Sequence, residues 1–511
     1  MPTTRALSVL RVTGATLSAL ALLGAGLYMS SGATDGWMKG IIPSPSSKST
    51  TTMQNVAQQT SSLFCPAGMT LADDAKFGDS DYQATAGDLK SASRVAGIGA
   101  LYQAEFDDVN QTNTKSLILD GATMNAQSLV TDTSDASTAR TLTTRTLKAD
   151  RLTGGTGSVV SWATTGDVRG VSAAQCTTYR TRQAFLIPAT NTGWSQRLVV
   201  ANSSDKPTSI TLHAWGTKSG EELNLATNAK ATVDAHSTMT VDLSAALNSA
   251  ESTYVQVIAS GAPVATIIQA IHMNGLTPLG SEDIMPLNAA ATNQVVPGVS
   301  GVSSAQLNLF ASTDTQVRLT YITDKGKGSS RTVHLTAHRV YTVTLDDISE
   351  GTKSILLDST SAVQASAFTQ VDGQDGQTDF AISGASQAYN AYAVTLPDDT
   401  QSTIDITNTS PATRKAKIVA YGSDGKSKGE KEITISAHSV ASFNVDDFGD
   451  GVVFATISQS KEDKSSLVVG QNISVKSLAD AHIAARATLT CPSMELNTIQ
   501  FAVTHAKTVL N

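Results

Sequence analysis

The chain has 511 residues, a formal net charge of −8, and only 16% charged and 5% aromatic residues. An acidic chain lacks the basic footprint that nucleic-acid binding needs, so no nucleic-acid partner is expected. The hydrophobic fraction of 40% is sufficient for packed cores, and the abundance of Ser, Thr and Val favours strands.

The N-terminal segment predicts export. Arg5 and Arg11 precede an uncharged apolar run over residues 12–29, which is close to the shortest length that spans a bilayer. The positive-inside rule then places the rest of the chain outside the cell membrane, as a single-pass protein. Residues 1–33 are either this membrane anchor or a signal segment that is cleaved near Ala33, which would give a secreted protein.

A linker and a first folded region follow. Residues 34–60 are rich in Ser, Thr and Pro and are predicted to form a flexible linker. A diverged β domain is predicted over residues 61–178, because the strand-like run that begins at Val159 resembles the closing strands of the later repeats. The Gly-rich stretch from Gly154 is interpreted as a hairpin turn, since neither Lys-Ser nor Lys-Thr follows it as in a phosphate loop.

One short stretch recurs three times. Its copies begin at Ala235, Ala337 and Ala437, about 100 residues apart, and each continues with His and an alternating apolar run. Alternation with a period of two indicates a strand with one buried face. The predicted fold class is mostly β, with tandem immunoglobulin-like β-sandwich domains after an N-terminal membrane helix. The β-sandwich repeats are predicted at residues 183–288, 293–387 and 388–476, followed by a C-terminal tail at 477–511 that packs back on one of the domains.

Three cysteines bear on the compartment and on the first domain. An exported chain can oxidise a cysteine pair. Cys65 and Cys176 bracket the diverged β domain, so a disulfide between them would join its two ends. A bond between Cys65 and Cys491 remains an alternative, because both residues precede a proline. The chain has no Cys-x-x-Cys sequence, which excludes zinc ribbons and thioredoxin-type sites.

The histidines do not predict a metal site. His236, His338 and His438 occupy one position of the repeat, and residues repeated in every domain usually serve the fold. His334 and His338 have a spacing that suits zinc on a helix. On a strand they would lie roughly 13 Å apart, too far to share an ion. We therefore predict no metal ligand and no cofactor.

The remaining polar groups do not predict catalysis. Ser195 lacks the second Gly and the strand-turn-helix of a nucleophile elbow. The acid pairs that begin at Asp346 and Asp446 would point to opposite faces of a strand. Three aspartates in a Gly-rich loop do not have the spacing of a calcium loop. They are Asp372, Asp375 and Asp379. We predict no catalytic residue and no enzymatic activity.

Three stretches support a family resemblance: Cys176-Thr177-Thr178, the strand from Leu198 to Asn202, and Val296-Pro297-Gly298. The chain resembles DUF5719, an actinobacterial family of exported proteins of unknown function, over about residues 60 to 475. The resemblance implies export and an envelope location, and it transfers no catalytic residue. The tail with Cys491 departs from the family pattern.

These observations predict a structural or interaction protein of the cell envelope, attached to the membrane through residues 12–29. The alternative is a glycan-binding accessory protein for polysaccharide assembly or attachment. It would use exposed aromatic side chains, for which the candidates are Trp162, Trp194 and Trp215. An enzyme would instead require a polar cleft between domains, with convergent carboxylates or histidines.

Overall fold

The computed structural model describes residues 50–57, 59–71, 85–110, 116–117, 128–226, 229–247, 249, 251–346, 348, 351–495 and 498–505. The predicted membrane segment, residues 12–29, lies outside this part. None of the helices in the described residues is both long and apolar enough to cross a bilayer.

The chain divides into two units. The described strands of the smaller unit, which comprises residues 1–56 and 498–511, are β1 (Thr50–Ala57) and β34 (Thr498–His505), which pair with each other. The larger unit, residues 57–497, is referred to below as the body.

The body repeats one strand order four times. Counted in chain order, eight strands form one sheet in the order 1-6-3-4 and a second in the order 5-2-7-8. Strand 2 pairs with strand 5, and strand 3 with strand 6, as in an immunoglobulin domain. Strand 7 pairs with strand 2 here, whereas in an immunoglobulin domain it pairs with strand 6. We call the four units sandwiches 1 to 4.

The strands of the first two sandwiches have the following bounds. Sandwich 1 consists of β2 (Thr60–Cys65), β3 (Lys90–Gly99), β4 (Leu101–Asp108), β5 (Ser116–Leu117), β6 (Ser128–Ser134), β7 (Arg140–Thr146), β8 (Gly154–Ala163) and β9 (Gly170–Gln175), and β10 (Thr177–Thr178) pairs with β2. Sandwich 2 consists of β11 (Arg182–Ile187), β12 (Trp194–Asn202), β13 (Thr208–Trp215), β14 (Lys230–Val233), β15 (Ser237–Asp242), β16 (Thr253–Ser260), β17 (Ala265–Asn274) and β18 (Thr277–Ile284), with α2 (Leu243–Leu247) after β15.

The last two sandwiches follow the same order. Sandwich 3 consists of β19 (Ala291–Pro297), β20 (Ser304–Ala311), β21 (Thr315–Thr323), β22 (Gly326–Leu335), β23 (Val340–Thr344), β24 (Thr352–Asp372) and β25 (Thr378–Gly384), and the long β24 supplies both strand 6 and strand 7. Sandwich 4 consists of β26 (Ala391–Thr395), β27 (Thr400–Asn408), β28 (Arg414–Gly422), β29 (Ser427–Ile435), β30 (Val440–Asn444), β31 (Val452–Ser458), β32 (Leu467–Val475) and β33 (Ala487–Thr490), with the helical turns η3 (Val445–Phe448) and α3 (Lys476–Asp480). β33 falls in the segment that the sequence suggested was a tail, where it pairs with β32.

Alternating side chains build the cores between paired sheets. Along β13, Ile210, Leu212 and Ala214 are buried while their neighbours are more exposed. They pack with Leu198 and Val200 of the other sheet. This is the half-buried strand pattern that the sequence alternation predicts.

The repeated histidines form tight turns between strands 4 and 5. His236, His338 and His438 have φ angles of 48°, 57° and 50°, in the left-handed region where His is enriched. Their backbone N–H groups donate to three carbonyl oxygens, those of Ser204, Ala311 and Ser410. The repeat therefore marks a backbone conformation, and each histidine lies in a different sandwich.

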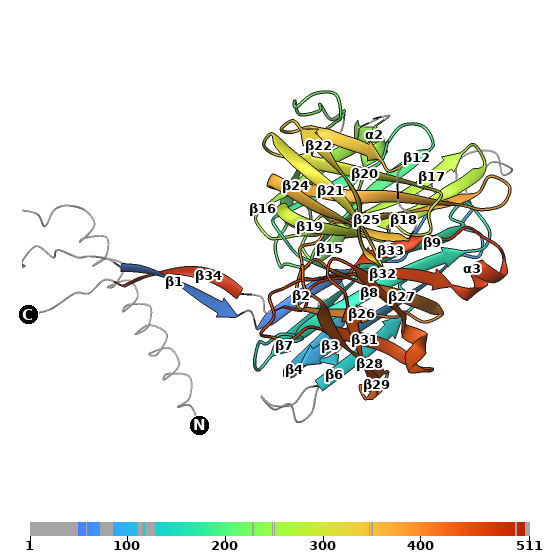
Figure 1. The fold of residues 1–511 in the computed structure, drawn as a ribbon. Helices are drawn as coiled ribbons and strands as arrows, with labels where there is room; N and C mark the ends of the chain where they lie inside the picture. The colour runs from blue at the N-terminus through green and yellow to red at the C-terminus, as the bar shows by residue number, and fades with distance from the viewer. Residues whose placement is uncertain are drawn as a thin grey trace, which may run out of the picture. The chain divides into compact units, whose positions relative to one another are not determined.

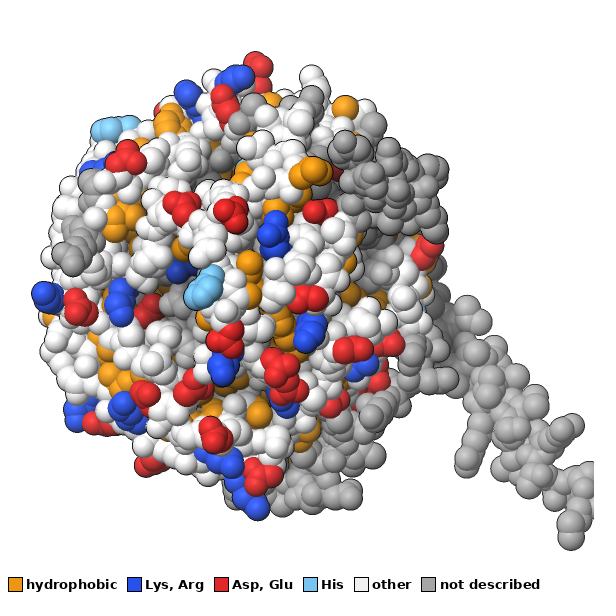
Figure 2. Space-filling model, turned by 90° about the vertical axis from the view of Figure 1, so that its right-hand side faces the viewer, with side chains coloured by type: hydrophobic (Ala, Val, Ile, Leu, Met, Phe, Trp, Pro, Cys, Tyr) orange, Lys and Arg blue, Asp and Glu red, His pale blue; other side chains and the backbone are white. Residues whose placement is uncertain are grey.

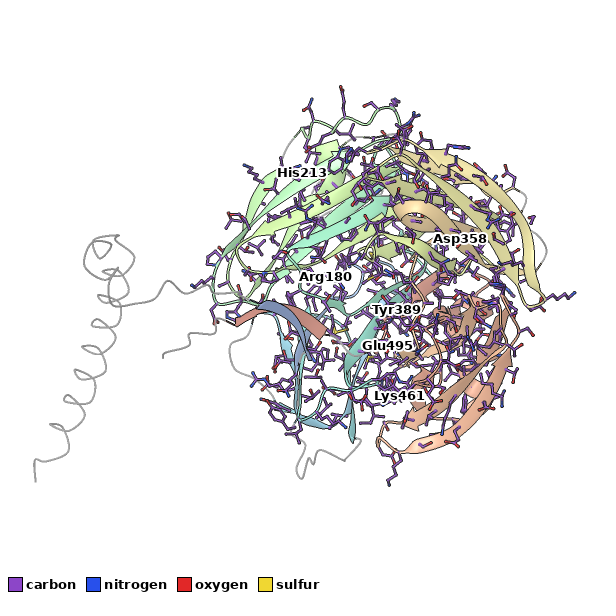
Figure 3. All side chains as sticks on the ribbon, turned by 60° about the vertical axis from the view of Figure 1, so that its left-hand side comes forward. Arg180, His213, Asp358, Tyr389, Lys461 and Glu495 are labelled. Atoms are coloured by element: carbon purple, nitrogen blue, oxygen red, sulfur yellow. A yellow bond between two sulfur atoms is a disulfide. The ribbon has the colours of Figure 1, made fainter. Side chains whose placement is uncertain are left out.

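In sandwiches 2, 3 and 4, the turn between strands 3 and 4 lies against strand 5 of the next sandwich, or against the turn before that strand. A Cβ on Gly220 would lie 2.9 Å from the Ala337 carbonyl oxygen, and one on Gly326 would lie 4.0 Å from that of Ala437. The series returns to sandwich 1, because a Cβ on Gly425 would lie 2.6 Å from the carbonyl oxygen of Leu129 in β6. Figure 3 shows the four sandwiches arranged around a common centre, and Figure 1 labels many of their strands.

Sandwiches 1 and 4, which are far apart in sequence, share a buried interface. Trp162 and Val171 of sandwich 1 pack in one apolar cluster with Leu478 and Leu489. The Ser158 and Thr395 hydroxyls are hydrogen-bonded at 2.7 Å. Arg94 and Asp398 form an ion pair across the same interface. The body is therefore closed rather than extended.

The eighth strands β9, β18, β25 and β33 meet at the centre of the body. Asp379 of β25 is 0% exposed. Its carboxylate accepts hydrogen bonds from the backbone N–H groups of Val171 at 3.0 Å and Arg486 at 2.8 Å. It also accepts from the N–H groups of Phe380 and Ser281. One buried carboxylate thus contacts all four sandwiches. Asp379 lies in strand β25 and not in the Gly-rich loop where the sequence interpretation placed it.

Two further acids are buried near the centre. Glu282 accepts a hydrogen bond from the Ala173 N–H at 2.9 Å. Burial raises the pKa of Glu282 and of Asp379 well above the ordinary range, and the backbone N–H groups offset part of this rise. Burial raises the pKa of Asp283 to about 7, against the lowering influence of Gln269 and Arg197.

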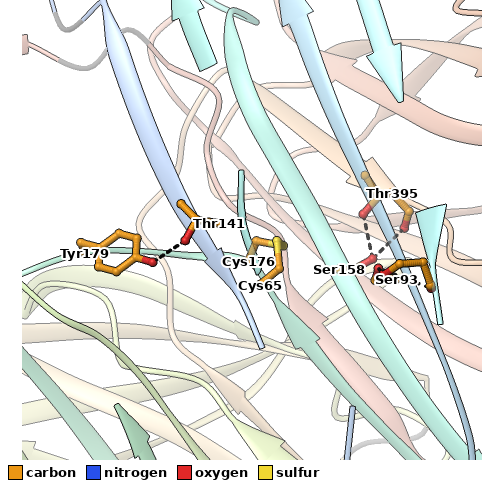
Figure 4. Close-up of a disulfide and its surroundings, with 8 residues drawn as sticks. Cys65, Ser93, Thr141, Ser158, Cys176, Tyr179 and Thr395 are labelled. Atoms are coloured by element: carbon orange, nitrogen blue, oxygen red, sulfur yellow. Dashed lines mark hydrogen bonds between the residues drawn. A yellow bond between two sulfur atoms is a disulfide. The ribbon is translucent and has the colours of Figure 1, made fainter. Parts of the chain in front are cut away.

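A disulfide joins Cys65 at the end of β2 to Cys176 after β9 (Figure 4). It connects the first strand of sandwich 1 to the segment that leaves its last strand. Close to it, Tyr179 and Thr141 hydroxyls are hydrogen-bonded at 2.7 Å. Cys491 is a free, buried thiol.

The surface mixes charges of both signs. On the face shown in Figure 2, acidic and basic side chains are interspersed among polar groups and small apolar areas. Among the described residues, the large hydrophobic side chains that stand exposed are Tyr102 and Leu276.

Candidate functional site

A groove of about 660 Å³ lies between sandwiches 2 and 3. We call it the aromatic groove. The side chains that define it are Trp194, His272, Gln306, Arg339, Tyr341 and Gln370. Its volume is within the range of small-molecule binding sites.

The floor of the aromatic groove is a stacked ring pair. Trp194 of β12 lies directly opposite His272 of β17 in the strand register, so the sheet itself brings their rings together. The ring centroids are 3.9 Å apart and the planes differ by 7°. Phe380 meets Trp194 edge-on at 5.4 Å, and Phe368 does so at 6.4 Å. These contacts fix the orientation of Trp194.

Sandwich 3 contributes a second aromatic ring. The Arg339 guanidinium lies over the Tyr341 ring, 5.2 Å from its centroid, at a distance typical of a cation–π contact. The Nε of Arg339 donates to the Thr217 carbonyl of sandwich 2. The Tyr341 hydroxyl donates to Thr336 Oγ1 at 2.9 Å. Both side chains are only partly buried, so parts of them face the groove.

Amides and charges surround these rings. Gln306 is exposed, and Asn308 beside it accepts a hydrogen bond from the Thr342 hydroxyl at 2.9 Å. On the sandwich 2 side, Lys218 and Glu251 lie 4.0 Å apart at the surface. The groove thus combines ring faces with hydrogen-bond donors and acceptors.

His272 is neutral at neutral pH. Burial lowers its pKa to about 4. A neutral imidazole has one N–H donor and one acceptor nitrogen, so it complements a hydroxyl, which is both donor and acceptor. Aromatic faces next to amide, imidazole and guanidinium groups suit a polyhydroxylated ligand with an apolar face, which is the chemistry of a sugar ring.

The three tryptophans predicted as exposed platforms have different environments. The expectation is wrong for Trp162, which is 5% exposed in the interface with sandwich 4. Trp215 is partly exposed and packs with Tyr254 and Phe310 between sandwiches 2 and 3. Trp194 is the tryptophan that lines the aromatic groove.

The other sequence candidates remain dispersed. The His236 imidazole contacts the exposed Asp205 carboxylate at 2.7 Å, and His334 is exposed on β22. Ser195 lies within the β12 ladder opposite Ile271. Within the described ranges, no group of three His, Cys, Asp or Glu side chains is arranged to hold a metal ion. Asp347 lies outside the described residues.

Of the six side chains that define the aromatic groove, only Trp194 was a candidate from sequence. The other five were missed: His272, Gln306, Arg339, Tyr341 and Gln370. Arg339 and Tyr341 follow the repeated His338 closely, and that position was interpreted only in terms of the fold. One feature of the sequence could have indicated the pair: Trp194 and His272 lie on two strand-like runs of the same repeat.

Comparison with known proteins gives one family. A family model described as "Family of unknown function (DUF5719)" matches residues 130–446. No curated protein matches the chain.

Three solved structures show distant likeness. A tetra-tandem repeat in the extending region of a large adhesion protein is 14% identical, with 80% of this chain and 92% of that chain covered and a TM-score of 0.11. Streptomyces avermitilis α-L-rhamnosidase complexed with L-rhamnose is 10% identical, with 83% of this chain and 57% of that chain covered and a TM-score of 0.12. Two B repeat units of the Staphylococcus aureus collagen-binding protein are 11% identical, with 77% of this chain and 98% of that chain covered and a TM-score of 0.09. Likenesses with such TM-scores indicate nothing about the function of this chain.

Proposed function

The chain belongs to the DUF5719 family of unknown function, and from that premise we propose that it is a non-enzymatic protein of the cell envelope. In this proposal residues 12–29 anchor it in the cell membrane and the body lies outside. Its closed set of four sandwiches acts as a rigid structural or interaction module.

The disulfide is the observation that most supports an extracytoplasmic location. Cys65 and Cys176 are bonded, and such bonds persist in oxidising compartments and are rare in the cytosol. The apolar run after Arg5 and Arg11 supplies the matching export signal. A cleaved signal segment and a secreted body are the alternative within this proposal.

Location is tested in intact cells. We expect an external protease to reach the chain, and a thiol reagent to show Cys65 and Cys176 oxidised. Deletion of residues 12–29 is the matched control, and it should leave the chain inside with both thiols reduced. A wild-type chain that resists protease until the cells are lysed would contradict the proposal. The mass of the mature protein separates the anchored from the cleaved form.

Glycan binding is the second candidate function, and the aromatic groove is the observation that favours it. Trp194 and Tyr341 provide ring faces, while Gln306, Gln370 and Arg339 provide polar contacts along one hollow. In this role the protein helps to assemble or attach an envelope polysaccharide.

Binding to purified envelope polysaccharide tests the second candidate. Tyr341→Ala and Arg339→Ala are each expected to weaken binding about tenfold, equivalent to about 1.4 kcal/mol. Tyr102→Ala is the matched control, because Tyr102 is an exposed aromatic of sandwich 1 and does not line the groove. An equal loss of binding in Tyr102→Ala, or no loss in the groove variants, would contradict glycan binding by the aromatic groove.

A further inference from the structure

A second hollow of about 390 Å³ lies where the segments that leave the four sandwiches meet. We call it the linker cavity. Each of these segments contributes to the lining of the cavity. Examples are Arg180 after sandwich 1, Asn288 after sandwich 2, Tyr389 after sandwich 3 and Glu495 after sandwich 4. Figure 3 shows Arg180, Tyr389 and Glu495 near the centre of the body.

Three charged side chains line the linker cavity: Asp150, Arg180 and Glu495. Asp150 pairs with Lys461 at 3.2 Å, whereas Arg180 and Glu495 do not pair. The Arg180 Nε donates to the Thr178 hydroxyl at 2.9 Å. One Glu495 oxygen accepts from the Asn390 N–H at 2.6 Å. The two side chains form no ion pair with each other, since none of the described pairs within 4.0 Å includes either one. Arg180 is exposed and Glu495 is partly buried. Two donor nitrogens of Arg180 and one oxygen of Glu495 have no partner among the described hydrogen bonds, so they are open to a ligand that enters from solvent.

Tyr389 lies within the electrostatic influence of both charges. Burial raises the pKa of the Tyr389 phenol, the Arg180 cation lowers it, and the Glu495 anion raises it. The positive charge of Arg180 and the negative charge of Glu495 therefore both influence the Tyr389 side chain in the cavity wall. A simple anion in this cavity would be attracted by Arg180 and repelled by Glu495.

A buried hydroxyl without a partner points to an occupant. Thr144 lines the linker cavity and is 1% exposed. Its Oγ1 has no hydrogen-bond partner among the described residues. The neighbouring Thr146 hydroxyl, in contrast, donates to the Gln59 carbonyl at 3.3 Å. An unsatisfied buried polar group costs about 1–3 kcal/mol, and a bound molecule that hydrogen-bonds to it removes that cost.

We propose that the linker cavity binds a small zwitterion, either a free amino acid or a short peptide with both termini free. Its carboxylate contacts the Arg180 guanidinium, its ammonium group contacts Glu495, and one of its polar atoms hydrogen-bonds to the Thr144 hydroxyl. The cavity volume is at the lower end of the range for small-molecule sites, which suits a ligand of one or two residues. This site is separate from the aromatic groove and does not depend on the proposed envelope role.

Calorimetry on the full chain tests the proposal, with L-alanyl-L-alanine as the probe. We expect saturable binding. N-acetylation of the probe, or amidation of its carboxyl group, is expected to weaken binding at least about tenfold, since each removes one charge contact. Acetate and ethylammonium, each with one charge, are expected to bind more weakly than the dipeptide.

Two charge variants with matched controls locate the site. Arg180→Ala and Glu495→Gln are expected to weaken dipeptide binding at least about tenfold, and Gln at position 495 still offers an oxygen to the Asn390 N–H. Arg182→Ala and Glu462→Gln change exposed charges outside the lining and should leave binding unchanged. Thermal unfolding of each variant establishes that it is folded.

Three results would overturn the proposal. They are the absence of dipeptide binding in the millimolar range to the folded wild-type chain, equal binding of the capped dipeptides, and unchanged binding in folded Arg180→Ala and Glu495→Gln. Acetate that binds as tightly as the dipeptide would show an anion site and would equally refute a zwitterion site.

Discussion

The centre of the body and the aromatic groove both lie where sandwiches meet, but they use polar side chains in opposite ways. At the centre, Asp379 and Glu282 are fully buried and accept hydrogen bonds from backbone N–H groups of other sandwiches. In the aromatic groove, Tyr341 and Arg339 are only partly buried.

The strand edges explain this difference. β9, β18, β25 and β33 are the last strands of their sheets, and at the centre they meet without joining into one sheet. Their outer N–H groups would remain unpaired in a buried region, at a substantial free-energy cost. The carboxylates of Asp379 and Glu282 satisfy several of these groups. Substitutions at the centre should therefore affect stability, and substitutions in the groove should affect binding.

The largest effect is expected from Asp379→Ala. It leaves the N–H groups of Val171, Ser281, Phe380 and Arg486 without their acceptor, and we expect a loss of about 5 kcal/mol in the free energy of unfolding. Denaturant unfolding measures this loss. Asp372→Ala, an exposed aspartate of the same hairpin, should lie within about 0.5 kcal/mol of wild type. Similar values for the two variants would remove the distinction between centre and surface.

Asp283→Asn is expected to change how stability depends on pH. The folded pKa of Asp283 is about 7 because of burial, against 3.8 for the ordinary group. Well below pH 3.8 both the folded and the unfolded state hold the proton. As pH rises toward 7 the unfolded state releases the proton first, so wild-type stability falls. The fall attributable to Asp283 is at most about 4 kcal/mol.

Unfolding at pH 4 and pH 7 measures the Asp283 contribution. The Asn variant should lose less stability than wild type over this interval, and the exposed Asp372→Asn variant should behave as wild type. An Asn variant with the wild-type pH dependence would show that Asp283 is already ionised in the folded body.

His272→Gln tests a residue of the aromatic groove whose effect on the pH dependence of stability is opposite to that of Asp283. Burial lowers the folded pKa of His272 to about 4, from 6.5 for the ordinary group. Its contribution is present above pH 6.5 and is lost as pH falls toward 4, because the unfolded state takes up the proton first. Since the ring is partly exposed, the expected effect is only about 1 kcal/mol. The variant should lose less stability on acidification than wild type, while His334→Gln on exposed β22 should not differ from it.

The smallest effect on stability is expected from Tyr341→Ala. The side chain is half-buried and its loss should cost about 1 kcal/mol of stability. The same variant is expected to bind glycan about tenfold more weakly. Thermal unfolding and polysaccharide binding on one sample give both values. A loss of several kcal/mol would mean that the groove is part of the structural core.

Local features of the fold could be predicted from sequence. Alternation along strands such as Thr208–Trp215 indicated β structure, because burial on one face has a period of two. The repeated histidine indicated the length of the unit, since a left-handed turn at His236, His338 and His438 accepts few residue types.

The closure of the body could not be predicted in the same way. Asp379 contacts Val171, 208 residues away, and Arg486, 107 residues away. In the sequence it is an aspartate beside a Gly-rich turn, which is a common solvated arrangement. Its burial results from packing among four separate sandwiches, and no local pattern encodes that packing.

The aromatic groove could be predicted only in part. Trp194 was one of three tryptophans named as candidate exposed aromatics for glycan binding. His272 becomes its partner through the register between β12 and β17, and Tyr341 reaches the groove through the docking of sandwich 3 on sandwich 2. Both depend on positions in space that residue types alone do not specify.

The central claim is that the four sandwiches form a closed body in which the first meets the fourth. Cysteines placed at Ser158 and Thr395, whose hydroxyls lie 2.7 Å apart, test this most directly, since a disulfide needs Cβ atoms about 4 Å apart. We predict near-complete formation of this disulfide in the double variant, detected by peptide mapping, and none in either single variant. A double variant that remains reduced under oxidising conditions, while the Cys65–Cys176 bond forms normally, would contradict the closed arrangement.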